Sequence, residues 1–443
     1  MSAVIEVERE KRFDWPVCYE AETWVLEQLD AVCERDEFAR TLRQRMRDET
    51  GTLLLDWVDH LIVSLEHESK LRELGFTEDD FGLWHHPEAM LPRVLLHEDH
   101  PVINIRVDSI ADFAAIHGIK SELQGDPLSR FRGLVVSPQF SAVERRGYRG
   151  FDFGKHSGDS LKAVLNAFEL WKTRARNSDD FGPTLNLLDR IIEMVGRDMA
   201  CHIVFAEERA YWERRNRAGQ VQKRRQDSLG LGWANHDHHT FRSSRERFVD
   251  LMKALEKLGF ERRERYYAGA QAGWGAQILE QPVEGIVAFC DVDLEPEETE
   301  IDFSRQPLPP SKKLGTIGLW VGLHGESFLQ AGMHHLECRF DYALLREQLA
   351  AEQVNTMKPF SDFPFLKQAF TEGERWPVKR ERAERLLRAG LITDAQLREF
   401  TTQGAIGSHL ENLQRKGGFK GFNQKSVSVI IQATDPRSQP GHA

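Results

Sequence analysis

Polar side chains recur at every second position in residues 235–243, Asn-His-Asp-His-His-Thr-Phe-Arg-Ser. Successive side chains of a β-strand point to opposite faces of the sheet. If this stretch is a strand, one face carries His236, His238, Thr240 and Arg242, and the other carries His239 and Phe241. Two imidazoles, a hydroxyl and a guanidinium make a poor core. The pattern therefore predicts a site for a metal ion and a carboxylate, with His238 favoured over His236 and His239 as the ligand.

A second stretch with histidines, residues 333–341, sorts in the same way. Its first face carries His335, Glu337 and Arg339. Its other face carries His334, Leu336, Cys338 and Phe340, which are mostly apolar and should pack against a helix. His335 is therefore a better candidate ligand than His334.

Around these two stretches the hydrophobic periodicity changes along the chain. Residues 17–50 and 158–228 have the period of helices, with a break at Gly182-Pro183 in the second region. Shorter runs are expected as strands in the N-terminal half, at residues 52–63, 102–108 and 134–136. The segment from Arg209 to Gln226 is rich in arginine and lysine, and we interpret it as a solvated helix face with Trp212 turned inward.

The C-terminal half predicts strands interleaved with helices. We expect helices at 244–258 and 344–352, a helical insertion at 380–400 and a proline-rich loop at 293–313. Further strands are expected at 263–267, 275–279, 285–292, 315–323, 407–414 and 426–432.

Short sequence echoes indicate an internal repeat. Asp59-His60-Leu61 precedes Leu74-Gly75-Phe76 much as Asp237-His238-His239 precedes Leu258-Gly259-Phe260, and residues 106–109 echo residues 339–342. We predict an α+β protein in which βαβββ units form a cupped, vicinal-oxygen-chelate-like sheet. Residues 228–443 would form this metal-binding domain. Residues 1–227 would form a largely helical N-terminal domain that can include a degenerate unit.

Composition narrows the class of protein. The chain has 443 residues and a net charge of −11, which argues against general binding to nucleic acid or to anionic membranes. Its N-terminal residues are charged where a signal peptide needs an apolar run, and no apolar stretch approaches the roughly 20 residues of a membrane span. The five cysteines include no Cys-x-x-Cys pair. We therefore expect a cytoplasmic protein; the oligomeric state cannot be predicted.

Two histidines from separate strands leave room for an anionic third ligand. Two imidazoles and one carboxylate with adjacent open positions suit Fe(II). Glu411, which lies between Leu410 and Leu413, is the preferred candidate. The alternatives that remain are Glu337, Glu326 and His324. Arg242 either clamps a substrate carboxylate with its planar guanidinium or pairs with an internal acid.

These motifs resemble those of a known family. Asp237-His238-His239-Thr240-Phe241-Arg242 resembles the first-strand motif, Asp-His-x-x-Phe-Arg, of the 2-oxoadipate dioxygenase/decarboxylase family in the vicinal-oxygen-chelate superfamily. Residues 334–339 are similar to its second ligand strand, and residues 410–415 look like its third. The resemblance covers about residues 230–430. It implies His238, His335 and Glu411 as Fe(II) ligands and Arg242, together with Arg339, as contacts to the substrate.

The function that this resemblance implies is a non-haem iron dioxygenase. Its substrates would be O2 and a 2-oxo acid or a similar small carboxylate, with oxidative decarboxylation or hydroxylation as the reaction. One alternative is a metal-dependent isomerase or lyase of the glyoxalase kind, in which the metal polarises a carbonyl and a carboxylate moves protons. Another is a non-catalytic binding protein with a vestigial metal pocket.

Overall fold

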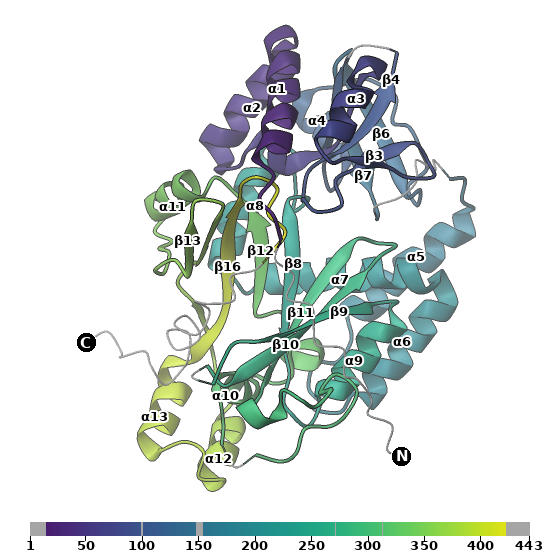
Figure 1. The fold of residues 1–443 in the computed structure, drawn as a ribbon. Coiled ribbons are helices and arrows are strands. Elements are labelled where there is room, and N and C mark those ends of the chain that lie inside the picture. Colours follow the sequence, from purple (N-terminus) through teal and green to yellow (C-terminus); the bar gives the residue numbers. More distant parts are fainter. Residues whose placement is uncertain (1–14, 99–100, 148–153, 271, 312, 422–443) are drawn as a thin grey trace, which may run out of the picture.

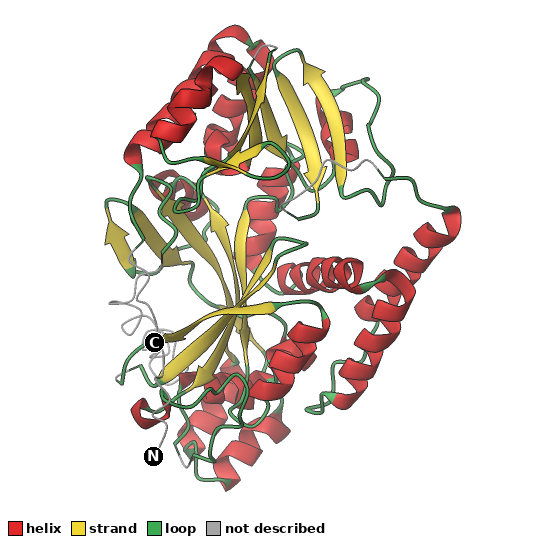
Figure 2. Ribbon diagram, turned by 45° about the vertical axis from the view of Figure 1, so that its right-hand side comes forward, coloured by secondary structure: helices red, strands yellow, loops and turns green. Residues whose placement is uncertain are grey.

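The computed structural model describes residues 15–98, 101–147, 154–270, 272–311 and 313–421. The fold is α+β, with helices packed around two mixed sheets (Figures 1 and 2). The strand predicted at 426–432 lies outside the described residues. None of the described helices is both long and apolar enough to span a membrane.

The larger sheet is built from two βαβββ units. The first unit consists of β8 (His236–Arg242), α9 (Phe248–Lys257), β9 (Glu261–Tyr267), β10 (Trp274–Gln281) and β11 (Ile286–Asp293). The second consists of β12 (His335–Arg339), α11 (Tyr342–Ala351), β13 (Ser361–Phe363), β14 (Leu366–Phe370) and β16 (Ala405–Arg415). In each unit the last strand lies parallel beside the first. The strands β8 and β12 pair antiparallel and join the two units. This confirms the predicted vicinal-oxygen-chelate-like units.

The smaller sheet repeats this topology in the N-terminal half. A complete unit comprises β1 (Val58–Ser64), α3 (Glu68–Glu73), β2 (Thr77–Glu78), β3 (Leu83–His85) and β4 (Arg93–His97). A shorter unit comprises β5 (Val102–Arg106), α4 (Ile110–His117), β6 (Phe131–Ser137) and β7 (Phe140–Arg145). Again β1 pairs antiparallel with β5, and each closing strand lies parallel to the opening one. The internal repeat that the sequence echoes indicated is therefore present.

Most of the helices in the described chain belong to the N-terminal half, as predicted. The smaller sheet packs against α1 (Tyr19–Arg35) and α2 (Glu37–Arg45), with Trp24, Leu29 and Phe113 in one core. The larger sheet packs against α5 (Gly158–Lys172), α6 (Gly182–Val195), α7 (Arg197–Glu213) and α8 (Arg217–Asp227). Trp212 is fully buried, which confirms the inward orientation expected for it. The domain boundary at 227–228 stays a prediction.

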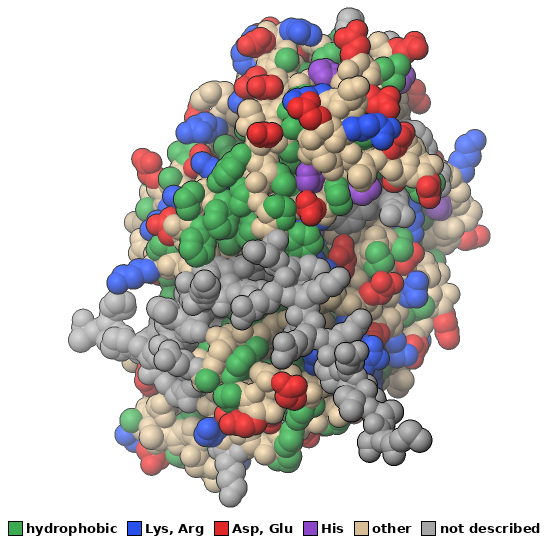
Figure 3. All heavy atoms as spheres, viewed as in Figure 1, with side chains coloured by type: hydrophobic (Ala, Val, Ile, Leu, Met, Phe, Trp, Pro, Cys, Tyr) green, Lys and Arg blue, Asp and Glu red, His purple; other side chains and the backbone are tan. Residues whose placement is uncertain are grey.

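Charged side chains on the outside are mixed in sign. On the described part of the face in Figure 3, acidic and basic groups alternate and no broad basic area is visible.

The remaining elements are short turns of helix, η1 (Met46–Thr50), η2 (Leu54–Trp57), η3 (Leu65–His67), η4 (Pro296–Glu298) and η5 (Ser327–Ala331), the strand β15 (Glu374–Trp376), and the helices α10 (Thr316–His324), α12 (Arg380–Arg388) and α13 (Asp394–Gln403). The last two helices confirm the predicted insertion.

One predicted strand is wrong. Residues 315–323 form the helix α10 (Thr316–His324), which is apolar on nearly all sides and lies in the interior. A short apolar run has the composition of either a buried strand or a buried helix, so its pattern does not decide between them. A carboxylate that is distant in the sequence favours the helix here. Asp293 accepts hydrogen bonds from the backbone N–H groups of Gly315, Ile317 and Gly318 at the start of the helix.

Candidate metal centre

The three predicted ligands lie on three neighbouring strands in the middle of the larger sheet. In the register of these strands, His238 on β8 lies opposite Glu337 on β12, and Glu337 lies beside Glu411 on β16. His335 is two residues before Glu337, so its side chain leaves β12 on the same face. The order of strands β8, β12 and β16 therefore brings distant parts of the sequence to one point.

The structure brings His238, His335 and Glu411 together. One ligand atom from each lies within 4.8 Å of the others, and all three residues are buried. Nε2 of His335 is 3.0 Å from Oε2 of Glu411, and the two imidazole rings lie 5.6 Å apart between centroids. These distances place three donors around a space that a single cation can occupy.

Other polar groups orient these side chains. Nδ1 of His334 lies 3.0 Å from Nδ1 of His335, and the hydroxyl of Thr240 lies 2.8 Å from Nε2 of the same ring. The amide of Gln368 donates to Glu337 and to Glu411, at 3.1 Å in both cases. His334 contacts the ring nitrogen of His335 that does not face Glu411, and contacts of this kind fix the orientation of metal ligands in proteins.

Two further carboxylates lie beside the triad. Asp237, His238 and Glu337 form a second group whose ligand atoms lie within 4.8 Å. Oε1 of Glu337 is 3.2 Å from Nδ1 of His238. Glu337 therefore remains a candidate ligand or an acid next to the triad.

The electrostatics of the cluster fit a bound cation. Burial opposes the charge on His238, but the neighbouring carboxylates, Glu337 above all, raise its pKa to about 10. Burial and the nearby Glu411 raise the pKa of Glu337. Protons would thus balance the buried negative charge, and a metal ion can displace them. The donor set of two imidazoles and a carboxylate suits Fe(II) and does not exclude Zn²⁺.

Arg242 lies on β8, four residues after His238, and is 2 % exposed. Its Nε is 3.7 Å from Oδ2 of Asp291 on β11, and its guanidinium lies 5.6 Å from the centre of the Trp320 ring. Burial raises the pKa of Asp291 to about 7. Arg242 therefore has the internal acid that the sequence left open as an alternative, and the carboxylate clamp stays a prediction.

Arg339 is not brought to the triad. It ends β12, and its charge lowers the pKa values of Asp56 and Asp237, although burial still raises that of Asp56 to about 6. No contact joins Arg339 to His238, His335 or Glu411 in the described part of the chain. A contact to substrate at this position stays a prediction.

The other candidates are placed away from the three donors. Glu326 accepts hydrogen bonds from the Ser243 hydroxyl and the Ser244 backbone. His324 lies 3.0 Å from the carbonyl oxygen of Ile406, at the end of α10.

Two of the remaining histidines lie on the side of β8 that faces α7. The His236 and His239 rings are 5.1 Å apart, and His239 lies 3.1 Å from Nη1 of Arg209. The expectation that His236 shares the face of His238 is wrong. The pairing between β8 and β12 shifts register between Glu337 and Cys338, which interrupts the alternation beside His236.

Sequence reasoning missed Gln368 and Asp291, and used Arg415 only as part of a motif. Nη2 of Arg415 lies 3.4 Å from Asp237 and 3.8 Å from Glu337. Alternation along β14 and β11 could have placed Gln368 and Asp291 on the face of the larger sheet that carries the candidate ligands and Arg242. Neither stretch has a cluster of polar residues that would draw attention to it.

Fold and donor set together define an α+β protein of paired βαβββ units with a buried His-His-Glu cluster. No family model and no curated protein matches the chain. Solved structures that resemble it include methylmalonyl-CoA epimerase from Mycobacterium tuberculosis, at 12% identity and a TM-score of 0.24, covering 41% of this chain and 88% of that chain. A mutant 4-hydroxymandelate synthase from Streptomyces coelicolor has 10% identity and a TM-score of 0.29, covering 87% and 99%. YdcJ from Shigella flexneri, which includes domain DUF1338, has 10% identity and a TM-score of 0.25, covering 59% and 74%. Such low scores carry no argument about function.

Proposed function

We propose that this protein is a non-haem Fe(II)-dependent dioxygenase that acts on a 2-oxo acid or a similar small carboxylate. The observation that carries the proposal is the convergence of His238, His335 and Glu411, with ligand atoms within 4.8 Å of one another. Two imidazoles and one carboxylate leave adjacent positions for substrate and dioxygen, which is the donor set expected for such iron enzymes. The resemblance of the ligand strands to the 2-oxoadipate dioxygenase/decarboxylase family supports the same assignment.

A bound Fe(II) would supply the one-electron and O2 chemistry of the reaction. The side chains of the protein would do the rest. His238, His335 and Glu411 would hold the ion. His334 and Gln368 would keep the ligands oriented through the contacts described above.

Substrate binding is assigned to Arg242. A guanidinium can hold a carboxylate through two parallel hydrogen bonds. Because Arg242 and Asp291 are both almost completely buried, a substrate carboxylate would share the guanidinium with Asp291. Burial favours the protonated form of Asp291, and in that form it would not repel the incoming acid. Burial of the whole cluster would also keep water away from the reacting groups.

One observation favours a second candidate function. Glu337 is a fully buried carboxylate next to the triad, and its pKa is raised by burial and by Glu411. A carboxylate that exchanges protons beside a metal-bound carbonyl is what a metal-dependent isomerase or lyase needs. The second candidate is therefore an isomerase or lyase that uses Glu337 as its proton-transfer group.

The two functions differ in their need for oxygen. We would load the protein with Fe(II), add a panel of 2-oxo acids that includes 2-oxoadipate, and record O2 consumption together with CO2 release. The dioxygenase proposal expects both signals with at least one acid, and their loss in His335→Ala. Anaerobic turnover of the same acids, with Zn²⁺ or Mn²⁺ in place of iron, would instead establish the isomerase or lyase.

A further inference from the structure

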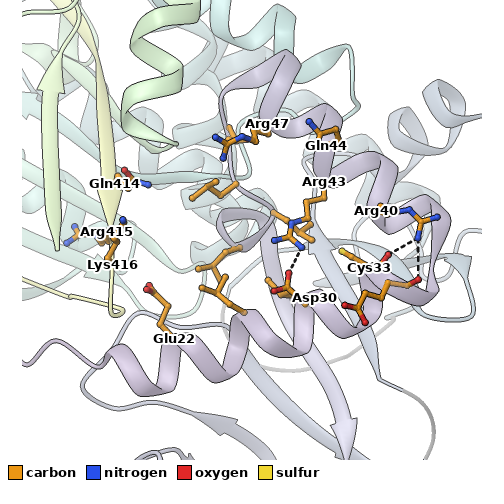
Figure 4. A pocket seen from close by; sticks show the side chains of 17 residues that line it. Glu22, Asp30, Cys33, Arg40, Arg43, Gln44, Arg47, Gln414, Arg415 and Lys416 are labelled. Carbon is orange, nitrogen blue, oxygen red and sulfur yellow. Dashed lines mark hydrogen bonds and ion pairs between the residues drawn. The ribbon is translucent and has the colours of Figure 1, made fainter. Parts of the chain in front are cut away.

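A cavity of about 730 Å³ lies between the N-terminal helices and the end of strand β16 (Figure 4). Its walls come from α1, α2, η1 and residues 52–55 on one side, and from Gln414, Arg415 and Lys416 on the other. The triad residues His238, His335 and Glu411 do not line it. Cavities of this size hold small organic molecules.

The lining of this cavity is amphipathic. Its apolar wall consists of Leu26, Leu29, Leu53, Leu54 and Leu55. Its basic side chains are Arg40, Arg43, Arg47, Arg415 and Lys416, and its acidic side chains are Glu22, Asp30 and Glu34. Basic groups therefore outnumber acidic ones, although the chain as a whole has a net charge of −11.

Most of these charges already have partners. Arg43 forms an ion pair with Asp30, and Arg40 donates to the carbonyl oxygens of Cys33 and Glu34. Arg47 lies 3.3 Å from Asp341. Within the described part of the chain, Lys416 has no ion pair and no side-chain hydrogen bond. Lys416 is exposed, and its ammonium group is the cation that remains to bind a ligand.

We propose that this cavity binds a small organic anion with an apolar chain, separately from the metal centre. The acid group of the ligand binds Lys416, and its chain packs against the leucine wall. Because burial of methylene groups is favourable, a chain of moderate length adds binding energy to the ion pair. Arg415 lines the cavity and also contacts Asp237, so the two sites share one side chain.

The test is a calorimetric titration of the full-length protein with decanoate. It uses the His335→Ala variant as background, so that binding of the acid to a metal ion cannot contribute. We expect one molecule of decanoate per chain. Lys416→Met should weaken binding about threefold, because an ion pair with an exposed side chain is lost, and Lys416→Arg should restore it. Leu26→Trp should abolish binding by filling the cavity.

Two controls make the result specific. Lys253→Met removes an exposed lysine on α9, outside the cavity, and should leave binding unchanged. Decanol, which has the same chain without the charge, should bind about threefold more weakly than decanoate. The proposal is overturned if the background variant does not bind decanoate, if decanol binds equally well, or if Lys416→Met and Leu26→Trp bind like Lys253→Met.

Discussion

The first strand of each sheet carries an Asp-His pair at the same structural position. Asp59 and His60 lie on β1, and Asp237 and His238 lie on β8. In both sheets this strand pairs antiparallel with the first strand of the next unit, and in both the register shifts by one residue beside the pair. The repeated fold therefore includes the same local irregularity.

The neighbours of the two histidines differ. Strand register gives the corresponding residues of the larger and the smaller sheet as Glu337 and Asn104, Glu411 and Ser141, and His335 and Val102. Of the three donors in the larger sheet, the smaller sheet keeps only the histidine. The second imidazole and the carboxylate are replaced by an apolar side chain and a hydroxyl.

Buried negative charge is balanced differently in the two places. Asp59 is contacted by Arg93 at 3.0 Å, by Arg145 at 2.9 Å and by Nδ1 of His60 at 2.7 Å. Burial raises its pKa, but these partners lower it well below the usual range. In the larger sheet Asp237 and Glu337 share Arg415, and a metal ion would supply the remaining positive charge. The same scaffold position can thus be stabilised by guanidinium groups or by a cation.

The largest effect that this comparison predicts is on metal binding. His238→Ala and His335→Ala should each lose the metal, because a third of the donor set disappears from a buried site. His60→Ala, at the equivalent position of the smaller sheet, should keep it. Metal analysis after reconstitution and gel filtration would show about one equivalent in the parent and in His60→Ala. A normal metal content in either of the first two variants would remove that residue from the site.

Asp59→Asn should reduce the free energy of unfolding by about 3–5 kcal/mol, because it leaves the buried guanidinium of Arg145 and the partly buried one of Arg93 without their anion. The folded pKa of Asp59 lies below the unfolded value, so this stabilisation is present above about pH 4 and is lost as the pH falls further. Urea unfolding at pH 7 and at about pH 3 measures both effects. A loss below 1 kcal/mol at pH 7 would mean that water, rather than Asp59, solvates the arginines.

Alternation along a single strand predicted much of the site. It selected His238 over His239 and His335 over His334, because those choices depend only on which face a side chain occupies. It failed for His236, where the register shift between β8 and β12 interrupts the alternation. Such a shift depends on the partner strand, and the sequence of one strand does not reveal it.

The sequence predicted the repeated βαβββ units, but it predicted the individual helices and strands less well. The echo between Asp59-His60-Leu61 and Asp237-His238-His239 indicated the repeat correctly. The helix α10 was missed because its capping carboxylate, Asp293, belongs to β11. Gln368 and Asp291 were missed because each is a single polar residue in its strand. Their contacts are made with residues of other strands, which the sequence of one strand does not reveal.

The two sheets also differ at the position of Arg242. The equivalent residue on β1 is Ser64, so the smaller sheet has no guanidinium at this position. Arg242→Ala should keep the metal and weaken the binding of a 2-oxo acid about 10- to 100-fold. Titration of the acid into the iron-loaded protein measures this, with Arg247→Ala, which is half exposed, as the control. If iron-loaded Arg242→Ala bound and turned over the acid like the parent, the clamp would be wrong.

A smaller effect is expected from Glu411→Gln in the metal-free protein. Burial raises the pKa values of Glu337 and Glu411, so the folded state holds protons that the unfolded state releases. The free energy of unfolding should therefore fall as the pH rises above the usual carboxyl range. Glu411→Gln should flatten this dependence and stabilise the metal-free protein by about 1 kcal/mol at pH 8. Ser141→Ala, at the equivalent position, should not change the slope of the parent.

The most direct test of the metal centre is a crystal structure of the iron-loaded protein with anomalous diffraction recorded on both sides of the iron edge. We predict one anomalous peak per chain, bonded to His238, His335 and Glu411, and none beside His60. A peak bonded to other residues, or three empty side chains after loading with Fe(II), would contradict the assignment.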